Sequence, residues 1–249
     1  ITPEQYKELD GIFTSNSFAY VPYQKLGKIT QQSHWIDEHI KQTLALKAVN
    51  RKAIRSRRYT VVVDAINGAG SVALPALLEK LGAKVVCINC KGDGDFVHKP
   101  EPIPAHLKQL ALAVRKHRAD VGMACDPDAD RLVLVDENGQ PINEELTLTV
   151  AVKQVLKRVN GPTVINLSTS STTASVAKAM GSTVFYSKVG ESNVVQMMRE
   201  KHAVIGGEGN GGVIYPAFHA GRDALVGAAL VLSCLAEERS TLSELVGTF

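Results

Sequence analysis

Short apolar runs and amphipathic segments alternate along most of the chain. An apolar run over residues 60–65 is followed by a glycine-containing turn, a helical pattern over 74–81 and another apolar run over 84–88. Runs of this length, bounded by turn residues, are typical of buried strands. The order strand, turn, helix, strand predicts a right-handed crossover unit with a parallel pair of strands.

The same alternation returns in the second half of the chain. Strand patterns over 163–167 and 183–186 alternate with helical patterns over 171–180 and 191–201, and a long apolar helical pattern follows near the end. Alternating strands and helices are typical of parallel sheets covered by helices. The sequence therefore predicts two α/β domains with a boundary near residue 143.

Composition narrows the class of protein. The 249 residues are 45% hydrophobic and 21% charged, which is ordinary for a globular protein. A net charge of +3, with no basic stripe, argues against nucleic acid as a partner. No apolar run is long enough to span a membrane and no signal peptide opens the chain, so we expect no membrane partner either.

The cysteines indicate a reducing environment. Four cysteines in a chain of 249 residues do not form a disulfide framework, and a cytoplasmic location is the simplest interpretation. Cys87 and Cys90 match a Cys-x-x-Cys pattern, but they end a strand pattern, whereas redox pairs of this kind normally open a helix. The position favours a structural role for the pair and leaves its chemistry open.

A loop with three carboxylates carries the first chemical signal. Asp126, Asp128 and Asp130 occupy alternate positions between two apolar runs, and Pro127 places them in a loop and not in a strand. Three anionic groups crowded at the end of a sheet repel one another, and Arg131 can neutralise only part of that charge. A divalent cation with oxygen ligands resolves the repulsion, and an all-oxygen set favours Mg²⁺ over zinc.

Two other interpretations of this loop stay open. An aspartyl-nucleophile phosphatase would use Asp126 as nucleophile and Asp128 as acid. It would also need a separate lysine and a downstream acidic pair, and no convincing acidic pair follows. The other interpretation is a non-catalytic module that binds a metal or a sugar. The phosphatase predicts a covalent aspartyl phosphate, which separates it from both other hypotheses.

A glycine-rich stretch carries the second signal. Five glycines surround Glu208 and Asn210 between residues 205 and 215, so the backbone can approach a ligand closely. A carboxylate accepts hydrogen bonds and an amide both donates and accepts them, which suits a pair of sugar hydroxyls. The stretch therefore predicts a sugar-binding loop, with a plain hairpin turn as the alternative.

Together these motifs resemble those of the α-D-phosphohexomutases, the family of phosphoglucomutase, phosphomannomutase and phosphoglucosamine mutase. The run 126–131, Asp-Pro-Asp-Ala-Asp-Arg, is similar to the family's metal-binding Asp-x-Asp-x-Asp-Arg loop. The run 207–211 is similar to its sugar-binding Gly-Glu-x-Ser-Gly loop, with Asn210 in place of the serine. The other segments that fit, in the same order, are Val61-Val62-Val63-Asp64-Ala65, Asn67-Gly68, Lys188-Val189-Gly190 and Gly221-Arg222-Asp223.

The resemblance implies a fold and a division of the chain. The implied fold is two consecutive three-layer α/β domains with mixed, mainly parallel sheets. Residues 1–50 would be the tail of a truncated first domain and a linker, 51–143 a metal-binding domain and 144–249 a sugar-binding domain. The abrupt start at Ile1 and stop at Phe249 fit a fragment without the family's first and fourth domains.

The resemblance further implies an activity and the residues that serve it. Members of the family move a phosphoryl group between positions 1 and 6 of a hexose phosphate, through a phosphoserine and a bisphosphorylated sugar. Phosphoryl transfer depends mainly on positioning and on neutralised charge. The implied roles are Mg²⁺ ligation by Asp126, Asp128 and Asp130, steadying of the transferring group by Arg131, and substrate binding by Glu208, Asn210, Lys188 and Gly190.

Two motifs of the family are missing from the sequence. It has no Ser-His-Asn-Pro-type motif for the phosphoserine and no Arg-x-Ser-Gly-Thr loop for the non-reacting phosphate. We therefore expect this polypeptide to bind a divalent metal weakly and to show no mutase turnover by itself. The sequence does not identify the sugar, because glucose, mannose and glucosamine phosphates all fit the resemblance.

Overall fold

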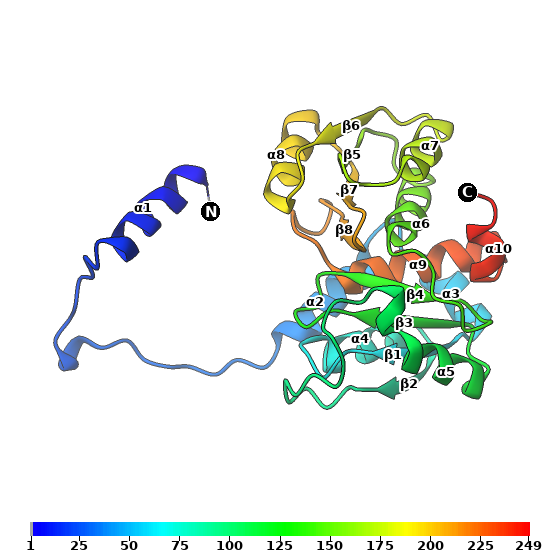
Figure 1. Cartoon of the computed structure of the whole chain (residues 1–249), viewed down its shortest axis with the longest axis horizontal. Helices are drawn as coiled ribbons and strands as arrows, with labels where there is room; N and C mark the ends of the chain where they lie inside the picture. Colours follow the sequence, from blue (N-terminus) through cyan, green and yellow to red (C-terminus); the bar gives the residue numbers. More distant parts are fainter. Residues whose placement is uncertain (1) are drawn as a thin grey trace. The chain divides into compact units, whose positions relative to one another are not determined.

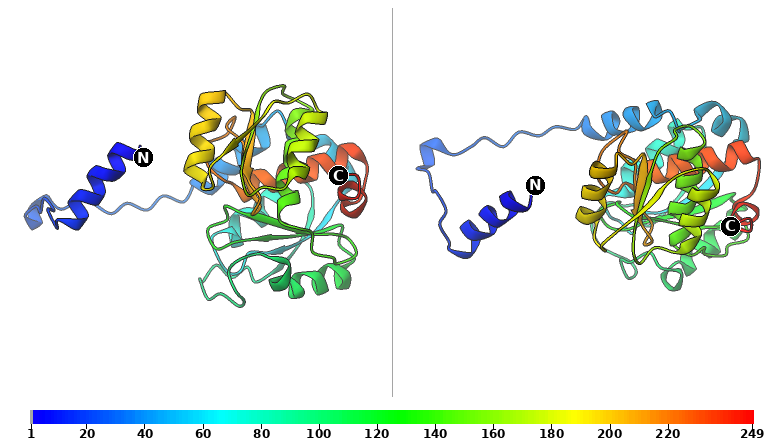
Figure 2. Two further views of the ribbon diagram at one scale, coloured as in Figure 1. Left: turned by 45° about the horizontal axis from the view of Figure 1, so that its top comes forward. Right: turned by 90° about the horizontal axis from the view of Figure 1, so that it is seen from above.

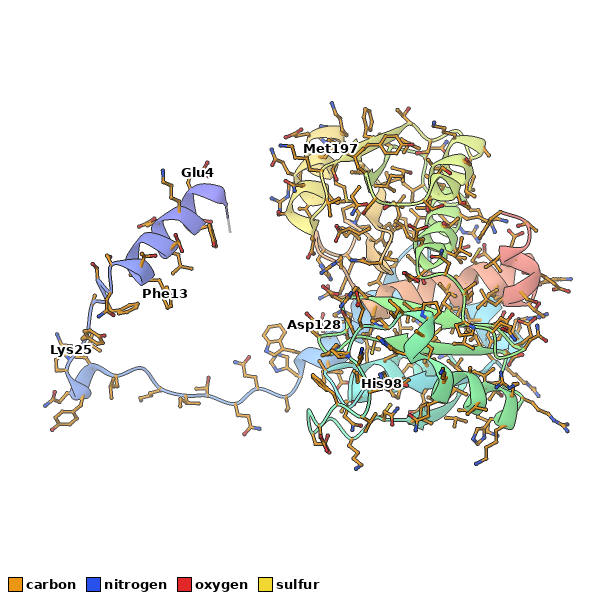
Figure 3. All side chains as sticks on the ribbon, viewed as in Figure 1. Glu4, Phe13, Lys25, His98, Asp128 and Met197 are labelled. Carbon is orange, nitrogen blue, oxygen red and sulfur yellow. The ribbon has the colours of Figure 1, made fainter. Side chains whose placement is uncertain are left out.

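The computed structural model describes residues 2–249, which divide into two compact units between residues 35 and 36. The first unit holds helix α1 (Pro3–Thr14) and the 3₁₀ turn η1 (Tyr23–Lys25) (Figure 1). A capping box fixes the start of α1, because the side chain of Thr2 accepts a hydrogen bond from the backbone of Gln5 and the Gln5 side chain accepts one from the backbone of Thr2. Apolar side chains of α1 are exposed, as Phe13 in Figure 3 illustrates.

The second unit contains a first sheet with strand order β2-β1-β3-β4 (Figure 1). Strands β1, β2 and β3 are parallel, and β4 runs antiparallel to β3. The crossover predicted from the apolar runs is formed by β1, α4 and β2. The bounds in this part are α2 Trp35–Ala45, α3 Arg51–Arg57, β1 Thr60–Asp64, α4 Gly70–Lys80, β2 Lys84–Ile88, η2 Pro104–His106, α5 Lys108–His117, β3 Val121–Cys125 and β4 Leu132–Val135.

Both faces of the first sheet are covered by helices. Val61 and Val63 of β1 belong to the core that includes α4, whereas Val62 packs with Leu110 and Val114 of α5. Successive side chains of a strand point to opposite faces, so a strand that is buried on both faces reads as a continuous apolar run. This explains the pattern in the sequence and confirms a three-layer arrangement.

The second sheet repeats this plan with strand order β6-β5-β7-β8, in which β5, β6 and β7 are parallel and β8 is antiparallel to β7. Helix α8 covers one face, and α6 and α7 lie on the other, as the right view of Figure 2 shows. The bounds here are α6 Glu145–Leu156, β5 Thr163–Asn166, α7 Ser171–Ala179, β6 Val184–Ser187, α8 Glu191–Lys201, β7 Ile205–Glu208, β8 Gly212–Ile214 and α10 Leu242–Val246. The mixed, mainly parallel sheets confirm the predicted fold class.

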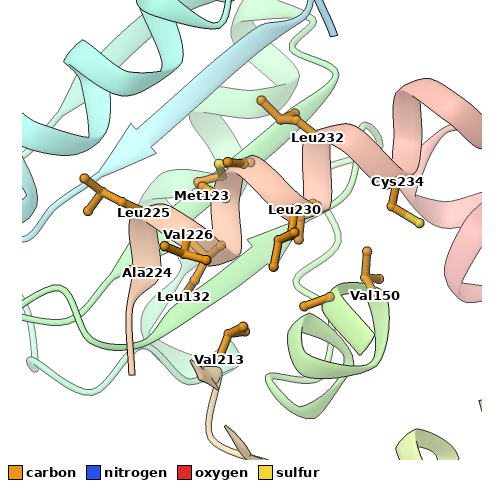
Figure 4. Packing of buried hydrophobic residues seen from close by; sticks show 14 of the residues in the cluster. Met123, Leu132, Val150, Val213, Ala224, Leu225, Val226, Leu230, Leu232 and Cys234 are labelled. Carbon is orange, nitrogen blue, oxygen red and sulfur yellow. The ribbon is translucent and has the colours of Figure 1, made fainter. Parts of the chain in front are cut away.

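Helix α9 (Ala224–Glu238) packs against both sheets. Thirteen of its fifteen residues are buried, and it contacts β4 of the first sheet and β8 of the second. Figure 4 shows Met123 and Leu132 from the first sheet, and Val150 and Val213 from the second part, gathered around it. A helix that is apolar on all sides is stable in water only when it is enclosed in this way. The two sheets therefore share one continuous core through α9.

The domain boundary near residue 143 stays a prediction. Residue 143 lies between β4 and α6, where one sheet ends and the elements of the other begin. No helix among residues 2–249 is both long enough and apolar enough to cross a membrane.

Candidate functional site

The two predicted loops lie at equivalent ends of their sheets. The aspartate loop, defined as residues 126–131, follows β3, and Glu208 is the last residue of β7. Figure 3 labels Asp128 on the aspartate loop. Both β3 and β7 are parallel to their central neighbours, so both loops project from carboxyl ends of parallel strands. Open α/β sheets bind their ligands at this edge.

The three aspartates of the loop converge, but their environments differ. One carboxylate oxygen from each of Asp126, Asp128 and Asp130 lies within 4.8 Å of the others. Asp126 is buried, and its Oδ1 accepts hydrogen bonds from the backbone N–H groups of Asp130 (3.1 Å) and Arg131 (3.0 Å). Its Oδ2 accepts a third from Nε of Arg131, at 2.6 Å. Asp128 is exposed, so the loop presents one fixed and one freely accessible carboxylate.

Asp130 supplies the clearest sign that the loop suits a cation. Its Oδ1 is buried and accepts no hydrogen bond from the residues that the structure describes, and Nε of Arg131 lies 3.7 Å from it. Burial raises the pKa of Asp130 to about 6; the negative charge of Asp126 acts in the same direction, and the positive charge of Arg222 opposes it. A buried carboxylate oxygen without a donor is costly unless a cation or a proton meets it. An all-oxygen set with this charge fits Mg²⁺.

The glycine-containing turn after β1 packs directly against the aspartate loop. The N–H of Ala69 donates to the carbonyl oxygen of Pro127 at 2.7 Å. A Cβ atom on Gly68 would lie 2.4 Å from that same oxygen, so only glycine allows the turn to approach so closely. The predicted Asn67-Gly68 motif therefore positions the loop.

Glu208 is held by donors from three segments of the second sheet. Its Oε1 accepts hydrogen bonds from Nδ2 of Asn166 (2.8 Å) and from the N–H of Gly190 (3.0 Å). Its Oε2 accepts one from the guanidinium of Arg222 at 2.9 Å. Gly190 caps α8 with a φ of 112°, a conformation that glycine adopts readily. The carboxylate is thus buried and fully oriented.

Arg222 joins the two loops. Its guanidinium contacts Glu208 of the second sheet and Oδ2 of Asp130 in the aspartate loop, the latter at 2.5 Å. Glu191 at the start of α8 accepts a hydrogen bond from the backbone N–H of Arg222 at 2.8 Å and lies 3.5 Å from its Nε. One side chain therefore pairs with carboxylates from both sheets.

Backbone contacts also hold the loops together. The N–H of Leu132 donates to the carbonyl oxygen of Gly211 at 3.0 Å, and the N–H of Ala224 donates to that of Ala129, also at 3.0 Å. Gly211 has a φ of 89°, and a Cβ atom there would lie 2.5 Å from the carbonyl oxygen of Leu132. The glycine-rich stretch thus lets the second sheet approach the aspartate loop closely.

The other site residues predicted from the sequence make fewer contacts. Asn210 is half-buried, and its Oδ1 accepts a hydrogen bond from the N–H of Gly212 at 3.2 Å. Lys188 follows β6 and is exposed, and within residues 2–249 its side chain makes no hydrogen bond or ion pair. Gly190 meets Glu208 through its backbone. The structure therefore brings Asp126, Asp130 and Glu208 together through Arg131 and Arg222, with Lys188 at the periphery.

The sequence interpretation missed Arg222, Asn166 and Glu191 as members of this site. The Gly221-Arg222-Asp223 segment did stand out, but only as a family motif and as the start of an apolar helix. Asn166 is the last residue of β5, at the same sheet edge as Glu208. A polar residue at the carboxyl end of a buried strand is a signal that could have identified it.

Comparison with known proteins matches the chain to one family. Residues 37–139 match the family model described as phosphoglucomutase/phosphomannomutase, alpha/beta/alpha domain II, and residues 143–249 match domain III of the same family. A phosphoglucomutase/phosphomannomutase of Thermococcus kodakarensis is 37% identical over 241 residues, covering 96% of this chain and 52% of that protein. A probable phosphoglucosamine mutase of Methanopyrus kandleri is 33% identical, covering 98% of this chain and 53% of that protein.

Solved structures agree with this match. A phosphoglucomutase/phosphomannomutase family protein of Burkholderia thailandensis has a TM-score of 0.83 at 26% identity, covering 99% of this chain and 52% of that one. An N-acetylphosphoglucosamine mutase of Aspergillus fumigatus, in complex with GlcNAc-6P and magnesium, shares the fold with a TM-score of 0.58 at 18% identity, covering 86% of this chain and 52% of that one. This chain spans about half the length of the curated relatives that it matches. On these grounds the chain belongs to the phosphoglucomutase/phosphomannomutase family.

Proposed function

We propose that this chain carries the metal-binding and sugar-binding parts of a phosphohexomutase. The reaction is an intramolecular phosphoryl transfer between positions 1 and 6 of a hexose phosphate, by way of a phosphoserine and a bisphosphorylated sugar. The names of the relatives, which include phosphoglucomutase/phosphomannomutase and probable phosphoglucosamine mutases, support this class of reaction. We assign the metal-binding part to residues 51–143 and the sugar-binding part to 144–249, with 1–50 as the tail and linker of a preceding domain.

The contact of Arg222 with both loops is the observation that carries the proposal. A hexose bisphosphate has phosphates at its ends and hydroxyls in between, so an enzyme must hold a phosphate and hydroxyls of one molecule at the same time. Arg222 pairs with Asp130 of the aspartate loop and with Glu208 of the glycine-rich loop. The two loops are therefore close enough to act on one small ligand.

The residues divide the work by their chemistry. Asp126, Asp128 and Asp130 would hold Mg²⁺, which would neutralise charge on the transferring phosphoryl group. Arg131 adds a positive charge at the same edge, with its guanidinium fixed against Asp126. These groups serve positioning and electrostatic stabilisation, which is what phosphoryl transfer needs from a protein.

The glycine-rich loop would orient the sugar. Asn210 carries an amide that can donate to and accept from hydroxyls, and Oε2 of Glu208, which accepts from Arg222, can accept one further hydrogen bond. Gly190 fixes Glu208 from the backbone. Lys188, exposed at the end of β6, can reach a phosphate from the periphery. Glucose, mannose and glucosamine phosphates are all candidate substrates.

The chain as given lacks motifs for two parts of the proposed reaction. A phosphoserine loop and a loop for the non-reacting phosphate would come from family domains 1 and 4. We therefore expect the 249-residue chain to bind the ligand as a half-site and to show no turnover by itself. The four cysteines are free thiols, which fits a reducing compartment such as the cytoplasm.

The aspartyl phosphatase alternative gains no support from the geometry. A nucleophilic carboxylate must be open to a substrate phosphorus, but Asp126 is 2% exposed and accepts three hydrogen bonds from its own loop. No observation favours the phosphatase over the mutase.

Isothermal titration of the chain with Mg²⁺, and then with glucose 1,6-bisphosphate in the presence and absence of Mg²⁺, tests the proposal. We expect weak Mg²⁺ binding that Asp128→Asn reduces at least about tenfold, since a lost ligand outweighs a lost outer contact. Glu208→Gln should weaken the binding of the bisphosphate and leave the affinity for Mg²⁺ unchanged. Asp37→Asn, which changes an exposed carboxylate on α2, is the matched control and should change neither affinity. Affinities that neither Asp128→Asn nor Glu208→Gln changes would contradict the proposal. Normal mutase turnover by the chain in a coupled assay would contradict it as well.

A further inference from the structure

A second cluster of metal-ligand residues lies apart from the aspartate loop. It consists of His39 on α2, His219 in the segment after β8, and Asp223 at the N-cap of α9. Oδ2 of Asp223 lies 2.7 Å from Nε2 of His39 and 2.9 Å from Nε2 of His219. All three ligand atoms lie within 4.8 Å of one another. Three separate segments therefore direct two imidazoles and one carboxylate to one point.

We propose that His39, His219 and Asp223 form a binding site for a divalent transition metal, with zinc as the metal that suits them best. Zinc in proteins is bound by imidazole nitrogens at about 2.0–2.1 Å and by carboxylate oxygens at similar distances. Two histidines and one carboxylate are also a set that other first-row divalent ions accept. The aspartate loop offers oxygen only, so the two sites would select different metals.

The ligand atoms need only a small adjustment to take a metal. Ligand atoms around a tetrahedral zinc lie about 3.3 Å apart, given bond lengths of about 2.0 Å. The two nitrogen–oxygen distances of 2.7 and 2.9 Å must therefore widen by roughly half an ångström. The side chain of His219 is 43% exposed and that of His39 is 30% exposed, so both rings have room to shift. The exposure of His219 also leaves a path for the metal and for a water ligand.

The carboxylate at the centre of the cluster is held ready for a cation. Asp223 is buried, and its Oδ1 accepts a hydrogen bond from the N–H of Val226 at 2.9 Å, which fixes the orientation of the carboxylate. Although burial raises the pKa of Asp223, hydrogen bonds from His219 and His39 lower it to about 2. The group is therefore anionic at neutral pH, as a metal ligand must be.

The rings of the two histidines both contact Phe218. The ring of Phe218 packs edge-on against that of His39, with 4.7 Å between centroids, and lies tilted against that of His219, with 4.8 Å between centroids. Nδ1 of His39 is buried and has no hydrogen-bond partner among the described residues. A metal at Nε2 would displace the proton shared with Asp223, and the neutral ring would then carry its proton on Nδ1, so metal binding must offset the cost of that buried N–H.

A metal at this point would stabilise the geometry of the candidate active site. Asp223 follows directly after Arg222, the residue that joins the two loops, and His39 ties the same point to α2. A metal bound there would fasten the start of α9 to α2 and restrict the movement of the Arg222 backbone. The inference concerns metal binding and holds whether or not the chain serves a mutase.

Cobalt titration of the full 249-residue chain tests the site. The chain is first freed of metal with a chelator and then titrated with Co²⁺ in excess Mg²⁺, which occupies the aspartate loop. We expect one equivalent of Co²⁺ to give the visible absorption of a low-coordinate complex, and zinc to displace it. His219→Ala should weaken binding by more than about tenfold, because even a lost outer-shell contact can cost that much.

Two controls make the outcome decisive. His117→Ala removes an exposed histidine on α5 and should leave the affinity for Co²⁺ unchanged. Asp126→Asn should also preserve the signal, which would show that the cobalt is not bound at the aspartate loop. If His219→Ala misfolds by circular dichroism, paramagnetic broadening of histidine ring signals in the unaltered protein takes its place. Absence of a one-to-one signal, equal affinity in His219→Ala, or broadening confined to other histidines would overturn the proposal.

Discussion

Replacing Arg222 with methionine should destabilise the second unit and should do so in a way that Mg²⁺ partly reverses. Methionine keeps most of the apolar length of the side chain and removes the charge. Asp130 loses the only side chain that donates a hydrogen bond to it among the described residues, and Glu208 loses one donor of three. The variant thus leaves the half-buried carboxylate of Asp130 poorly compensated and the buried carboxylate of Glu208 with two donors in place of three.

The expected loss in the free energy of unfolding follows from these contacts. Removing one partner of a buried ion pair costs about 3–5 kcal/mol. The side chain of Asp130 is 21% exposed and Glu208 keeps two donors, so we expect the lower end, about 3 kcal/mol. In a unit of this size, about 3 kcal/mol corresponds to a fall of roughly 6–12 °C in melting temperature. Mg²⁺ should raise the melting temperature of the variant more than that of the parent, because the cation replaces the missing positive charge beside Asp130.

Urea unfolding followed by far-ultraviolet circular dichroism measures this loss. The sole tryptophan, Trp35, is the first residue of α2 and is 62% exposed, so its fluorescence would change little on unfolding. Arg51→Met, at an exposed position at the start of α3, is the matched control and should change stability by less than about 0.5 kcal/mol. A loss for Arg222→Met as small as that of the control, or one that Mg²⁺ leaves untouched, would refute the reasoning.

Two further predictions concern the shared core and the aspartate loop. Leu230→Ala on α9 should lower the free energy of unfolding by about 3 kcal/mol in a single cooperative step, since its side chain is fully buried where both sheets pack, and two separate steps in urea would contradict the shared core. In the metal-free protein, the folded-state pKa of Asp130 is about 6, above its ordinary value, mainly through burial. The folded protein then binds the extra proton first, so stability should rise as the pH falls from 7 to 5. The parent should show this rise, Asp130→Asn should not, and saturating Mg²⁺ should remove it; an equal rise in Asp130→Asn would assign it to another group.

The sequence predicted those features that depend on residues close together in the chain. Strands β1 and β3 of the first sheet were visible because burial on both faces makes them continuous apolar runs, and the aspartate loop was visible because its three aspartates stand at alternate positions in one short stretch after β3. The apolar pattern near the end of the chain likewise predicted a long apolar helix, which is α9. It could not show that α9 packs on both sheets, because a helix that is apolar all round carries no information about its partners.

Arg222 escaped prediction because its partners are distant in the chain. It stands 14 positions from Glu208 and 92 from Asp130, and no local period connects them. The same holds for His39, which is 184 positions from Asp223. Pairs of this kind arise only when the fold has brought the two sheets together. Lys188 is the opposite case, since a family motif singled it out and the described structure gives its side chain no partner.

The structure also separates three aspartates that the sequence treats as equal. Both carboxylate oxygens of Asp126 accept hydrogen bonds from the backbone and guanidinium of its own loop, so Asp126 fixes the shape of the loop as well as offering a metal ligand. Asp130 has one oxygen paired with Arg222 and one buried without a donor, so it gains most from a cation. Asp128 is exposed to solvent, so its negative charge costs the loop least. A metal entering this site should therefore contact the exposed Asp128 first. It should lower the free energy of Asp130 most, and it should depend on Asp126 chiefly for the geometry of the loop.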